Sequence, residues 1–173
     1  MRAVGAAGTP GPDDAVLDEH DAVYLRRTIT LSALAAQRGS RPFGAVVVGA
    51  DGEVLAEACN DTARGDCAAH SEIEALRSAS GAHPREALAA ATIYASGEPC
   101  VMCAGGIYWA GIRRVVFGID AVALRDFRRL LPGTADLELS CREVFAASPQ
   151  PIEVVGPAPS EEAAAAHRTF WRA

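Results

Sequence analysis

Two short stretches of the chain carry the residue types of a metal site. Residues 69–72 read Ala-His-Ser-Glu, and residues 99–103 read Pro-Cys-Val-Met-Cys. A catalytic zinc ion takes three protein ligands and keeps one position open, and one imidazole with two thiolates supplies that set. Residues three apart on one helical turn point to the same side, so Cys100 and Cys103 can share one ion. The sequence therefore predicts one Zn²⁺ per chain, bound by His70, Cys100 and Cys103.

Glu72 lies two positions after His70, near the predicted ion without being forced onto it. The pattern H-x-E followed by P-C-x-x-C is the known signature of zinc nucleobase deaminases, in which the glutamate moves protons. We therefore predict that Glu72 is the catalytic acid and base, that a zinc-bound hydroxide is the nucleophile and that ammonia leaves. The alternative is a closed structural site with His83 or Cys67 as a fourth ligand, but such a site leaves the glutamate without a role.

The chain is long enough for one domain with a sizeable core, since it has 173 residues of which 50% are hydrophobic. We expect a flexible N-terminal tail, rich in Gly, Ala and Pro, at residues 1–13 and a single domain at residues 14–173. No apolar run is long enough to span a bilayer, and the N-terminus lacks the pattern of a secretory signal. Five cysteines, two of them in a ligand-type pair, favour a reducing, cytoplasmic setting.

Hydrophobic periodicity predicts helices that alternate with strands. Helices are expected at residues 14–38, 70–80, 85–91, 100–109, 122–131 and 160–171. Strands are expected at residues 45–48, 53–56, 92–95, 114–118 and 152–155, the first two joined by a turn at residues 50–52. The alternation predicts an α/β fold, a three-layer α/β/α sandwich with a central mixed five-stranded sheet. The two motifs then begin two helices, whose positive ends favour thiolates.

Four stretches together resemble the cytidine-deaminase-like superfamily, in the branch that contains bacterial guanine deaminases, tRNA adenosine deaminases and fungal cytosine deaminases. They are residues 41–45, Asn60, residues 66–73 and residues 98–107, within a similar region of about residues 23–120. The resemblance implies a zinc-dependent aminohydrolase that acts on a small nucleobase. It also implies a homodimer with sites near the subunit contact.

By this resemblance, several residues are expected to hold the substrate. Asn60 would bind the ring carbonyl or amide edge, because its amide offers both a donor and an acceptor. Phe43, with the Gly44 and Ala45 backbone, would line the base pocket. Ser71 stands where the family commonly has Ala, and its backbone amide is expected near the departing group. The alternatives are a turn residue for Asn60 and a core aromatic for Phe43.

Three further features bear on the choice of substrate. Trp109 belongs to Ile-Tyr-Trp-Ala at residues 107–110, which is similar to the guanine deaminase branch. Phe170 and Trp171 resemble the aromatic C-terminus that caps guanine-type sites, with anchoring of the last helix as the alternative. Asp120 would be a second acid that reads an exocyclic amine, although residues 117–129 depart from the usual guanine-type sequence.

The predicted substrate is therefore a free base, guanine or a related purine, in a role such as purine salvage. The alternatives are cytosine, triazines or modified bases, the wobble adenosine of tRNA and, outside enzymes, a zinc-stabilised binding or scaffold domain. A net charge of −6 and the lack of a clustered basic tail disfavour nucleic acid as a partner. No membrane partner is expected.

Overall fold

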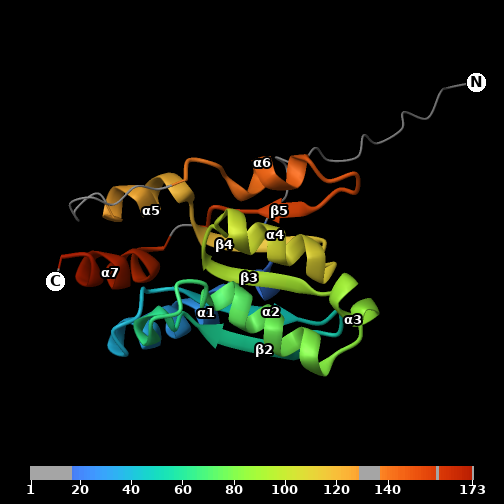
Figure 1. The fold of residues 1–173 in the computed structure, drawn as a ribbon, viewed down its shortest axis with the longest axis horizontal. Coiled ribbons are helices and arrows are strands. Elements are labelled where there is room, and N and C mark those ends of the chain that lie inside the picture. Colours follow the sequence, from blue (N-terminus) through green and yellow to red (C-terminus); the bar gives the residue numbers. More distant parts are fainter. Residues whose placement is uncertain (1–16, 129–136, 159, 173) are drawn as a thin grey trace, which may run out of the picture.

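A computed structural model describes residues 17–128, 137–158 and 160–172. Its centre is a five-stranded sheet in the order β2-β1-β3-β4-β5. The strands are β1 (Gly44–Val48), β2 (Val54–Cys59), β3 (Thr92–Gly97), β4 (Arg114–Ile119) and β5 (Glu153–Val155). β1 runs antiparallel to β2 and β3, whereas β3, β4 and β5 are parallel. The last residues of β2, β3 and β4 therefore meet the first residue of β1 at one end of the sheet (Figure 1).

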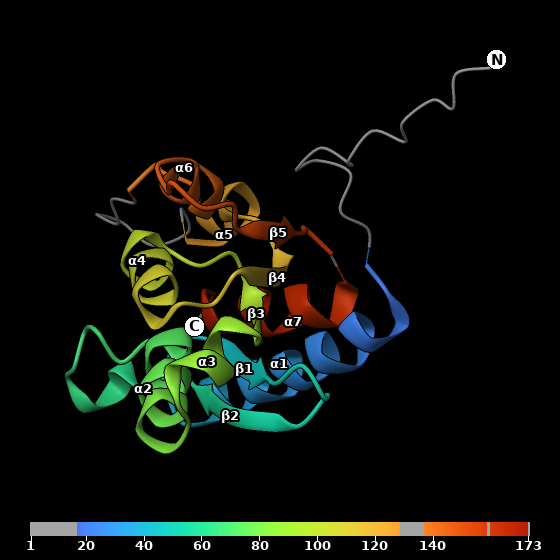
Figure 2. The ribbon, with the colours of Figure 1, turned by 90° about the vertical axis from the view of Figure 1, so that its right-hand side faces the viewer.

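Helices cover both faces of this sheet and confirm the predicted three layers. They are α1 (Glu19–Gln37), α2 (Ser71–Ala82), α3 (Arg85–Ala89), α4 (Val101–Ala110), α5 (Ala121–Arg128), α6 (Cys141–Ala146) and α7 (Glu161–Phe170), with a 3₁₀ turn η1 (Thr62–Arg64). α1 and α7 lie on one face, and α2 and α4 on the other (Figure 2). Within the described ranges, no helix combines the length and the apolarity that a membrane crossing requires.

The core follows the two-residue alternation of the strands. Val46 and Val116 are fully buried on the face that packs against Leu25 of α1. Their neighbours Val47 and Val115 point to the opposite face, into the larger cluster formed with α2, α4 and α6. Because both faces are covered, the strands read as nearly continuous apolar runs. Burial of both faces makes the sheet a rigid base for residues placed at its end.

Four helices begin later than predicted: α1, α2, α4 and α7 start at Glu19, Ser71, Val101 and Glu161. α1 begins at Glu19, because Asp18 accepts the backbone N–H of Asp21 at 2.7 Å in a capping box; residues 1–16 lie outside the described part of the chain. α4 begins at Val101, so Cys100 is its N-cap rather than its first helical residue.

Two elements after the sheet's centre also differ from the prediction. The helix expected at residues 122–131 is described as Ala121–Arg128, and residues 129–136 lie outside the described ranges. α6, with six residues, was not predicted. Its local signal is the capping box of Ser140 and Glu143.

Candidate active site

The four residues predicted for zinc binding and catalysis gather at the starts of two helices. His70 is the N-cap of α2, and Glu72 lies in its first turn. Cys100 is the N-cap of α4, which follows β3 after a short turn, and Cys103 lies in the first turn of α4. Helix N-termini carry partial positive charge, which favours thiolate over thiol. The fold therefore brings together residues about thirty positions apart in sequence, at the end of the sheet where several strands terminate.

The three candidate ligand atoms have the spacing of a tetrahedral zinc site. Nδ1 of His70 lies 3.6 Å from Sγ of Cys100 and 3.5 Å from Sγ of Cys103, and the two sulfurs are 3.6 Å apart. Zinc–ligand bonds of about 2.3 Å to sulfur and about 2.0 Å to nitrogen at tetrahedral angles give ligand separations of about 3.5–3.8 Å. His83 and Cys67 do not belong to this group among the described residues. The donor set therefore fits zinc with a fourth position left to a non-protein ligand.

The charges of the site also fit a cation. The hydrogen bond with Cys103 and the neighbouring His70 lower the pKa of Cys100 to about 4, against the effect of burial. The hydrogen bond with Cys100, burial and the charge of Glu72 raise the pKa of Cys103. The hydrogen bond with Cys100 raises the pKa of His70, although the charge of Arg41 opposes this. A bound divalent ion favours the thiolate form of both cysteines.

Glu72 is buried beside this group. Its side chain is 4% exposed, and Oγ of Ser71 donates a hydrogen bond to its Oε2 at 2.9 Å. Burial, followed by the negative charge of Cys100, raises the pKa of Glu72. A carboxyl group with a raised pKa is suited to moving protons during a reaction.

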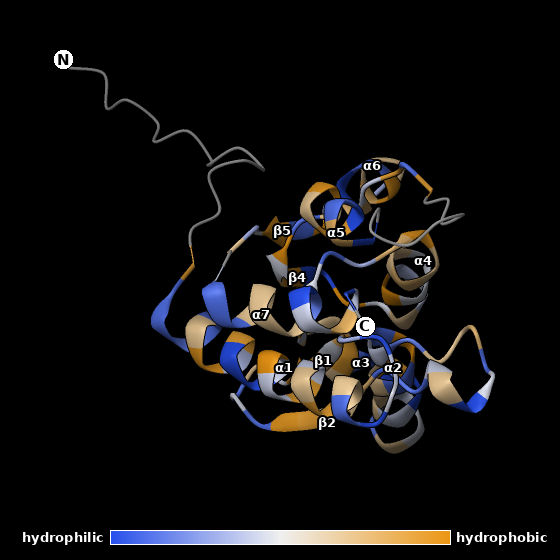
Figure 3. Ribbon diagram, turned by 90° about the vertical axis from the view of Figure 1, so that its left-hand side faces the viewer, coloured by the Kyte–Doolittle hydropathy of each residue, from blue (hydrophilic) through white to orange (hydrophobic). Residues whose placement is uncertain are grey.

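A cavity with a volume of about 760 Å³, including its open mouth, adjoins the group. Figure 3 faces this end of the molecule and shows α5 and α7 with hydrophilic and hydrophobic residues in alternating bands. The cavity is lined by Arg41, Phe43, His70, Glu72, Glu98, Pro99, Cys100, Val101, Ala121, Leu124, Arg125, Arg128, Leu137 and Leu139. It is therefore the natural space for a substrate, because candidate metal ligands and apolar walls meet there.

Of the predicted substrate residues Phe43, Asn60, Ser71 and Ala45, Phe43 is among the residues that line this cavity, and the other three are buried. Asn60 follows β2 and is 1% exposed; its Oδ1 accepts hydrogen bonds from Thr62, while its Nδ2 has no partner among the described residues. Ser71 is fully buried against Glu72, and Ala45 is fully buried in the sheet core. A buried amide with an unsatisfied donor indicates a place for a ligand oxygen.

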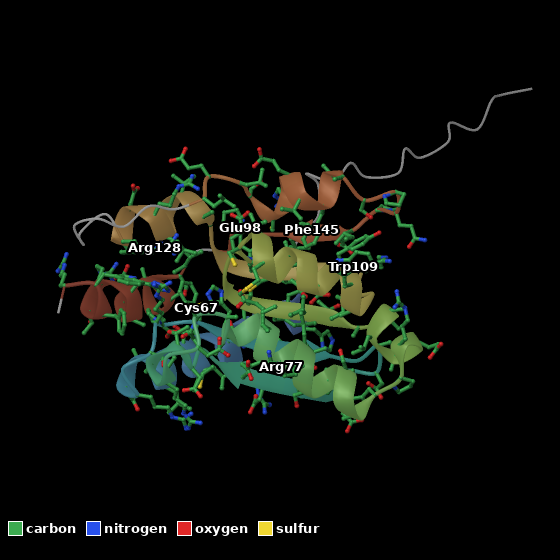
Figure 4. The ribbon with its side chains drawn as sticks, in the orientation of Figure 1. Cys67, Arg77, Glu98, Trp109, Arg128 and Phe145 are labelled. Atoms are coloured by element: carbon green, nitrogen blue, oxygen red, sulfur yellow. The ribbon has the colours of Figure 1, made fainter. Side chains whose placement is uncertain are left out.

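Asp120 and Trp109 are not among the residues that line the cavity. Oδ1 of Asp120 accepts the backbone N–H of Ala123 at 2.8 Å, so this carboxylate caps α5 beside the lining residue Ala121. Trp109 lies at the opposite end of α4 from Glu98 and is 73% exposed (Figure 4). The fold of one chain does not bring Trp109 to the cavity.

The C-terminal aromatic residues pack behind the cavity. Trp171 is 4% exposed, and its Nε1 donates to Nδ1 of His167 at 3.2 Å. The His167 ring in turn contacts Phe43, with ring centroids 5.1 Å apart. Phe170 and Trp171 line a separate hollow next to Arg41. In one chain they anchor α7 and support the aromatic wall, and contact with a substrate stays a prediction.

Glu98 and two cavity arginines were not predicted as site residues. Both oxygens of Glu98 accept backbone N–H groups, from Ala121 at 2.8 Å and from Cys141 at 3.0 Å, so this residue ties the starts of α5 and α6 to the site. Its position directly before the Pro-Cys motif was the available signal. Arg41 directly precedes the Pro-Phe-Gly stretch, whereas nothing in the sequence singled out Arg125.

Three candidate ligands that leave a fourth tetrahedral position, next to a buried carboxyl group, are the arrangement expected of a zinc-dependent hydrolase. Residues 18–119, more than half of the chain, match the family model described as the cytidine and deoxycytidylate deaminase zinc-binding region. The chain therefore belongs to this zinc-binding deaminase family, and it is a zinc-dependent aminohydrolase.

Individual relatives act on different bases. A protein of Schizosaccharomyces pombe described as a probable cytosine deaminase is 37% identical over 90% of this chain and 94% of its own. The solved guanine deaminase of Bacillus subtilis is 34% identical, with a TM-score of 0.56 over 64% of this chain and 69% of its own. A tRNA-specific adenosine deaminase of Agrobacterium fabrum is 44% identical over 55% of this chain and 62% of its own. The family is thus shared, while the named substrates differ.

Proposed function

We propose that the protein hydrolytically deaminates a small amino-substituted nitrogen heterocycle and releases ammonia. The observation that carries this proposal is the tetrahedral spacing of His70, Cys100 and Cys103 beside the buried carboxyl group of Glu72. A noncatalytic scaffold domain would need neither the open fourth position nor the adjoining cavity.

His70, Cys100 and Cys103 would hold the zinc ion. When bound, zinc supplies a Lewis acid that makes water a nucleophile at neutral pH. Glu72 accepts the proton of the attacking water and delivers it to a ring nitrogen of the substrate. Glu72 then takes the proton of the hydroxyl group on the tetrahedral carbon and gives it to the amine as the C–N bond breaks, so that ammonia departs and a carbonyl remains. The Ser71 hydroxyl holds one oxygen of Glu72 in place during these transfers.

Phe43 and Asn60 are proposed to position the ring. Phe43 forms an apolar wall of the cavity, and the unpaired Nδ2 of Asn60 can donate to a ring oxygen. The backbone N–H of Asn60 donates to the carbonyl oxygen of Phe43 at 2.9 Å, which couples the two residues. Roles for Ala45, Asp120, Trp109, Phe170 and Trp171 remain predictions from the family resemblance.

Two ring classes are candidates for the substrate. The Ile-Tyr-Trp-Ala segment favours a guanine-type purine. The similarity over 90% of the chain to a probable cytosine deaminase favours a cytosine-type pyrimidine. The net charge of −6 disfavours a tRNA substrate, which requires many phosphate contacts.

An ammonia-release screen tests this function. The zinc-loaded protein is incubated with guanine, isoguanine, cytosine, amino-triazines, the corresponding nucleosides and a tRNA anticodon loop. Release of ammonia from a free heterocycle supports the proposal, and release from the loop alone overturns it. Zinc content is measured on the same sample, because a metal-free preparation would give no information.

Two further features of the protein remain predictions. The five cysteines include no disulfide among the described residues, which fits the predicted cytoplasmic setting. A homodimer is expected from the family resemblance. Trp109, 73% exposed on α4, is a candidate for burial in such a dimer, which chromatography with light scattering would test.

A further inference from the structure

One face of α5 forms a wall of the active-site cavity. Ala121, Leu124, Arg125 and Arg128 all line the cavity, and their spacing of three, four and seven positions places them on one side of a helix. The apolar residues begin this face beside Glu98, and the arginines continue it toward the end of α5. The wall therefore changes from apolar to cationic along the helix.

Arg41 brings a further positive charge to the same cavity from the segment before β1. Neither Arg41 nor Arg125 has a hydrogen bond or ion pair with its guanidinium among residues 17–128, 137–158 and 160–172. Arg41 is exposed, whereas Arg125 is half-buried, and half-buried Arg114, Arg142 and Arg168 have partners, as Arg114 has with Asp21. Two guanidinium groups thus line a ligand cavity without an ion-pair partner among the residues that the structure describes.

The two acidic residues that line the cavity, Glu72 and Glu98, accept hydrogen bonds from other groups than the arginines. Both oxygens of Glu98 accept backbone N–H groups of Ala121 and Cys141. Glu72 is buried and accepts the hydroxyl hydrogen bond of Ser71. Among the described residues, neither carboxylate forms an ion pair with Arg41 or Arg125.

Resting on the proposed deaminase function, we propose that the preferred substrate is an amino-substituted heterocycle with an anionic substituent, which Arg41 and Arg125 bind while the ring lies over Phe43. The anion is a carboxylate or a phosphate, since both match the planar fork of donors that arginine presents. A wholly neutral base would leave the two guanidinium groups without a charged partner in the cavity. The arginines would then be specificity-determining residues, separate from those that move protons.

Matched substrate pairs test this inference. Each pair shares one ring and differs in charge: cytosine and 5-carboxycytosine, cytidine and its 5′-monophosphate, guanosine and its 5′-monophosphate. The wild-type enzyme is expected to show a kcat/KM at least about 10-fold higher for the anionic member of one pair, the size expected for one charge-assisted hydrogen bond. The carboxylate pair and the phosphate pairs distinguish the two kinds of anion.

Two variants assign the effect to residues. Arg125→Gln and Arg41→Gln are each expected to lower kcat/KM for the anionic member about 10- to 100-fold and to leave the neutral member within about 2-fold. Arg26→Gln is the matched control, because Arg26 is exposed on α1 and its removal changes the net charge equally. Calorimetric binding of the unreactive products, uracil and 5-carboxyuracil, gives the same comparison without turnover.

The outcomes separate this inference from the function on which it rests. Ammonia release from neutral rings only, or equal losses for both members of a pair in R125Q and R41Q, would overturn the anionic substrate while keeping the deaminase. No ammonia from any ring, charged or neutral, with zinc bound, would instead overturn the proposed function. An equal effect of R26Q would show that net charge, and not the cavity, selects the anion.

Discussion

The two ends of the parallel strands contain buried polar groups of opposite character. At the start of β4, Asp21 is fully buried, and both of its carboxylate oxygens accept hydrogen bonds from Arg114, at 2.7 and 2.9 Å. Tyr94 donates a further hydrogen bond to Asp21 at 2.9 Å. At the other end, His70, Cys100 and Cys103 turn toward one another, and Nδ2 of Asn60 has no partner among the described residues.

The difference is between polar groups that the chain satisfies itself and polar groups that it leaves to a ligand. Burial raises the pKa of Asp21, but the hydrogen bonds from Arg114 and its neighbours outweigh this effect, so the pKa lies below its usual value. A carboxylate held in this way stabilises the fold. A buried donor such as Nδ2 of Asn60 is costly unless a ligand accepts its hydrogen bond. We call the end with Asp21 and Arg114 the closed end, and the end with His70, Cys100 and Cys103 the open end. Substitutions at the closed end should therefore mainly lower stability, and substitutions at the open end should mainly lower activity.

The largest effect is expected from Glu72→Gln at the open end. Glutamine keeps the shape of the side chain but cannot shuttle a proton, so kcat should fall about 10³-fold, or about 4 kcal/mol in barrier height. Zinc content should remain near one per chain, because Glu72 is not among the candidate ligands. Ammonia release and metal analysis on the same sample check both points. Unchanged activity would contradict the assigned role of this glutamate.

The next effect is expected from Arg114→Met at the closed end. This variant leaves the Asp21 carboxylate buried without its ion pair, which should cost about 3 kcal/mol of unfolding free energy. The midpoint of urea unfolding measures the loss, while kcat/KM of the folded protein should stay within about 2-fold of wild type.

The control for Arg114 is Arg27→Met. Arg27 pairs with Glu57, but the side chains are 49% and 36% exposed, so loss of this pair should cost under about 1 kcal/mol. Similar losses for R27M and R114M would mean that burial does not distinguish the two pairs. Partial recovery of stability in the double variant D21N/R114M would show that the unpaired charge is the cause.

The sequence predicted the order of helices and strands because periodicity and turn residues are local properties. It placed the start of α1 too early, because a capping box at Asp18, rather than the apolar pattern, decides where that helix begins. It did not predict α6, whose six residues are defined by the contacts of Glu98 and the cap at Ser140. Such contacts join distant parts of the chain and leave no periodic pattern.

The candidate metal-binding and proton-transfer residues were predicted from motif spacing, because ligand chemistry restricts both residue type and interval, and the structure brings them together. The cavity-lining residues of α5 could not be predicted in this way. Arg125 lies on α5, whose orientation depends on packing against α7 and on the contact between Glu98 and Ala121. Trp109 shows the opposite case. Its segment resembles the guanine deaminase branch, but its side chain is exposed and lies outside the cavity of the single chain.

A smaller, pH-dependent effect is expected from His167, which is buried near the open end but behind the cavity. Burial and the charge of Arg128 lower the pKa of His167 to about 4, below its usual value of 6.5. As pH falls from about 6.5 to about 4, His167 becomes protonated in the unfolded chain but stays neutral in the folded protein. The free energy of unfolding therefore decreases in that pH range. At pH 5 the loss should be about 2 kcal/mol relative to pH 8.

The variant His167→Gln removes this titration while its amide oxygen can still accept from Nε1 of Trp171. Urea unfolding of wild type and H167Q at pH 8 and pH 5 gives the contribution as a difference of differences. Equal pH dependence of the two proteins would show that His167 remains protonated as readily in the folded state as in the unfolded chain.

The smallest effect is expected from Ser71→Ala, which removes one hydrogen bond inside the open end. The Ser71 hydroxyl donates to Glu72 at 2.9 Å, and both side chains are buried. Its loss should lower kcat about 3- to 10-fold, about 1 kcal/mol, with little change in KM, because the contact orients the carboxyl group and not the substrate. The family commonly has Ala here, so folding should be unaffected. A change confined to KM would instead place Ser71 in ring binding, and the hydroxyl would then belong with Asn60 and Phe43.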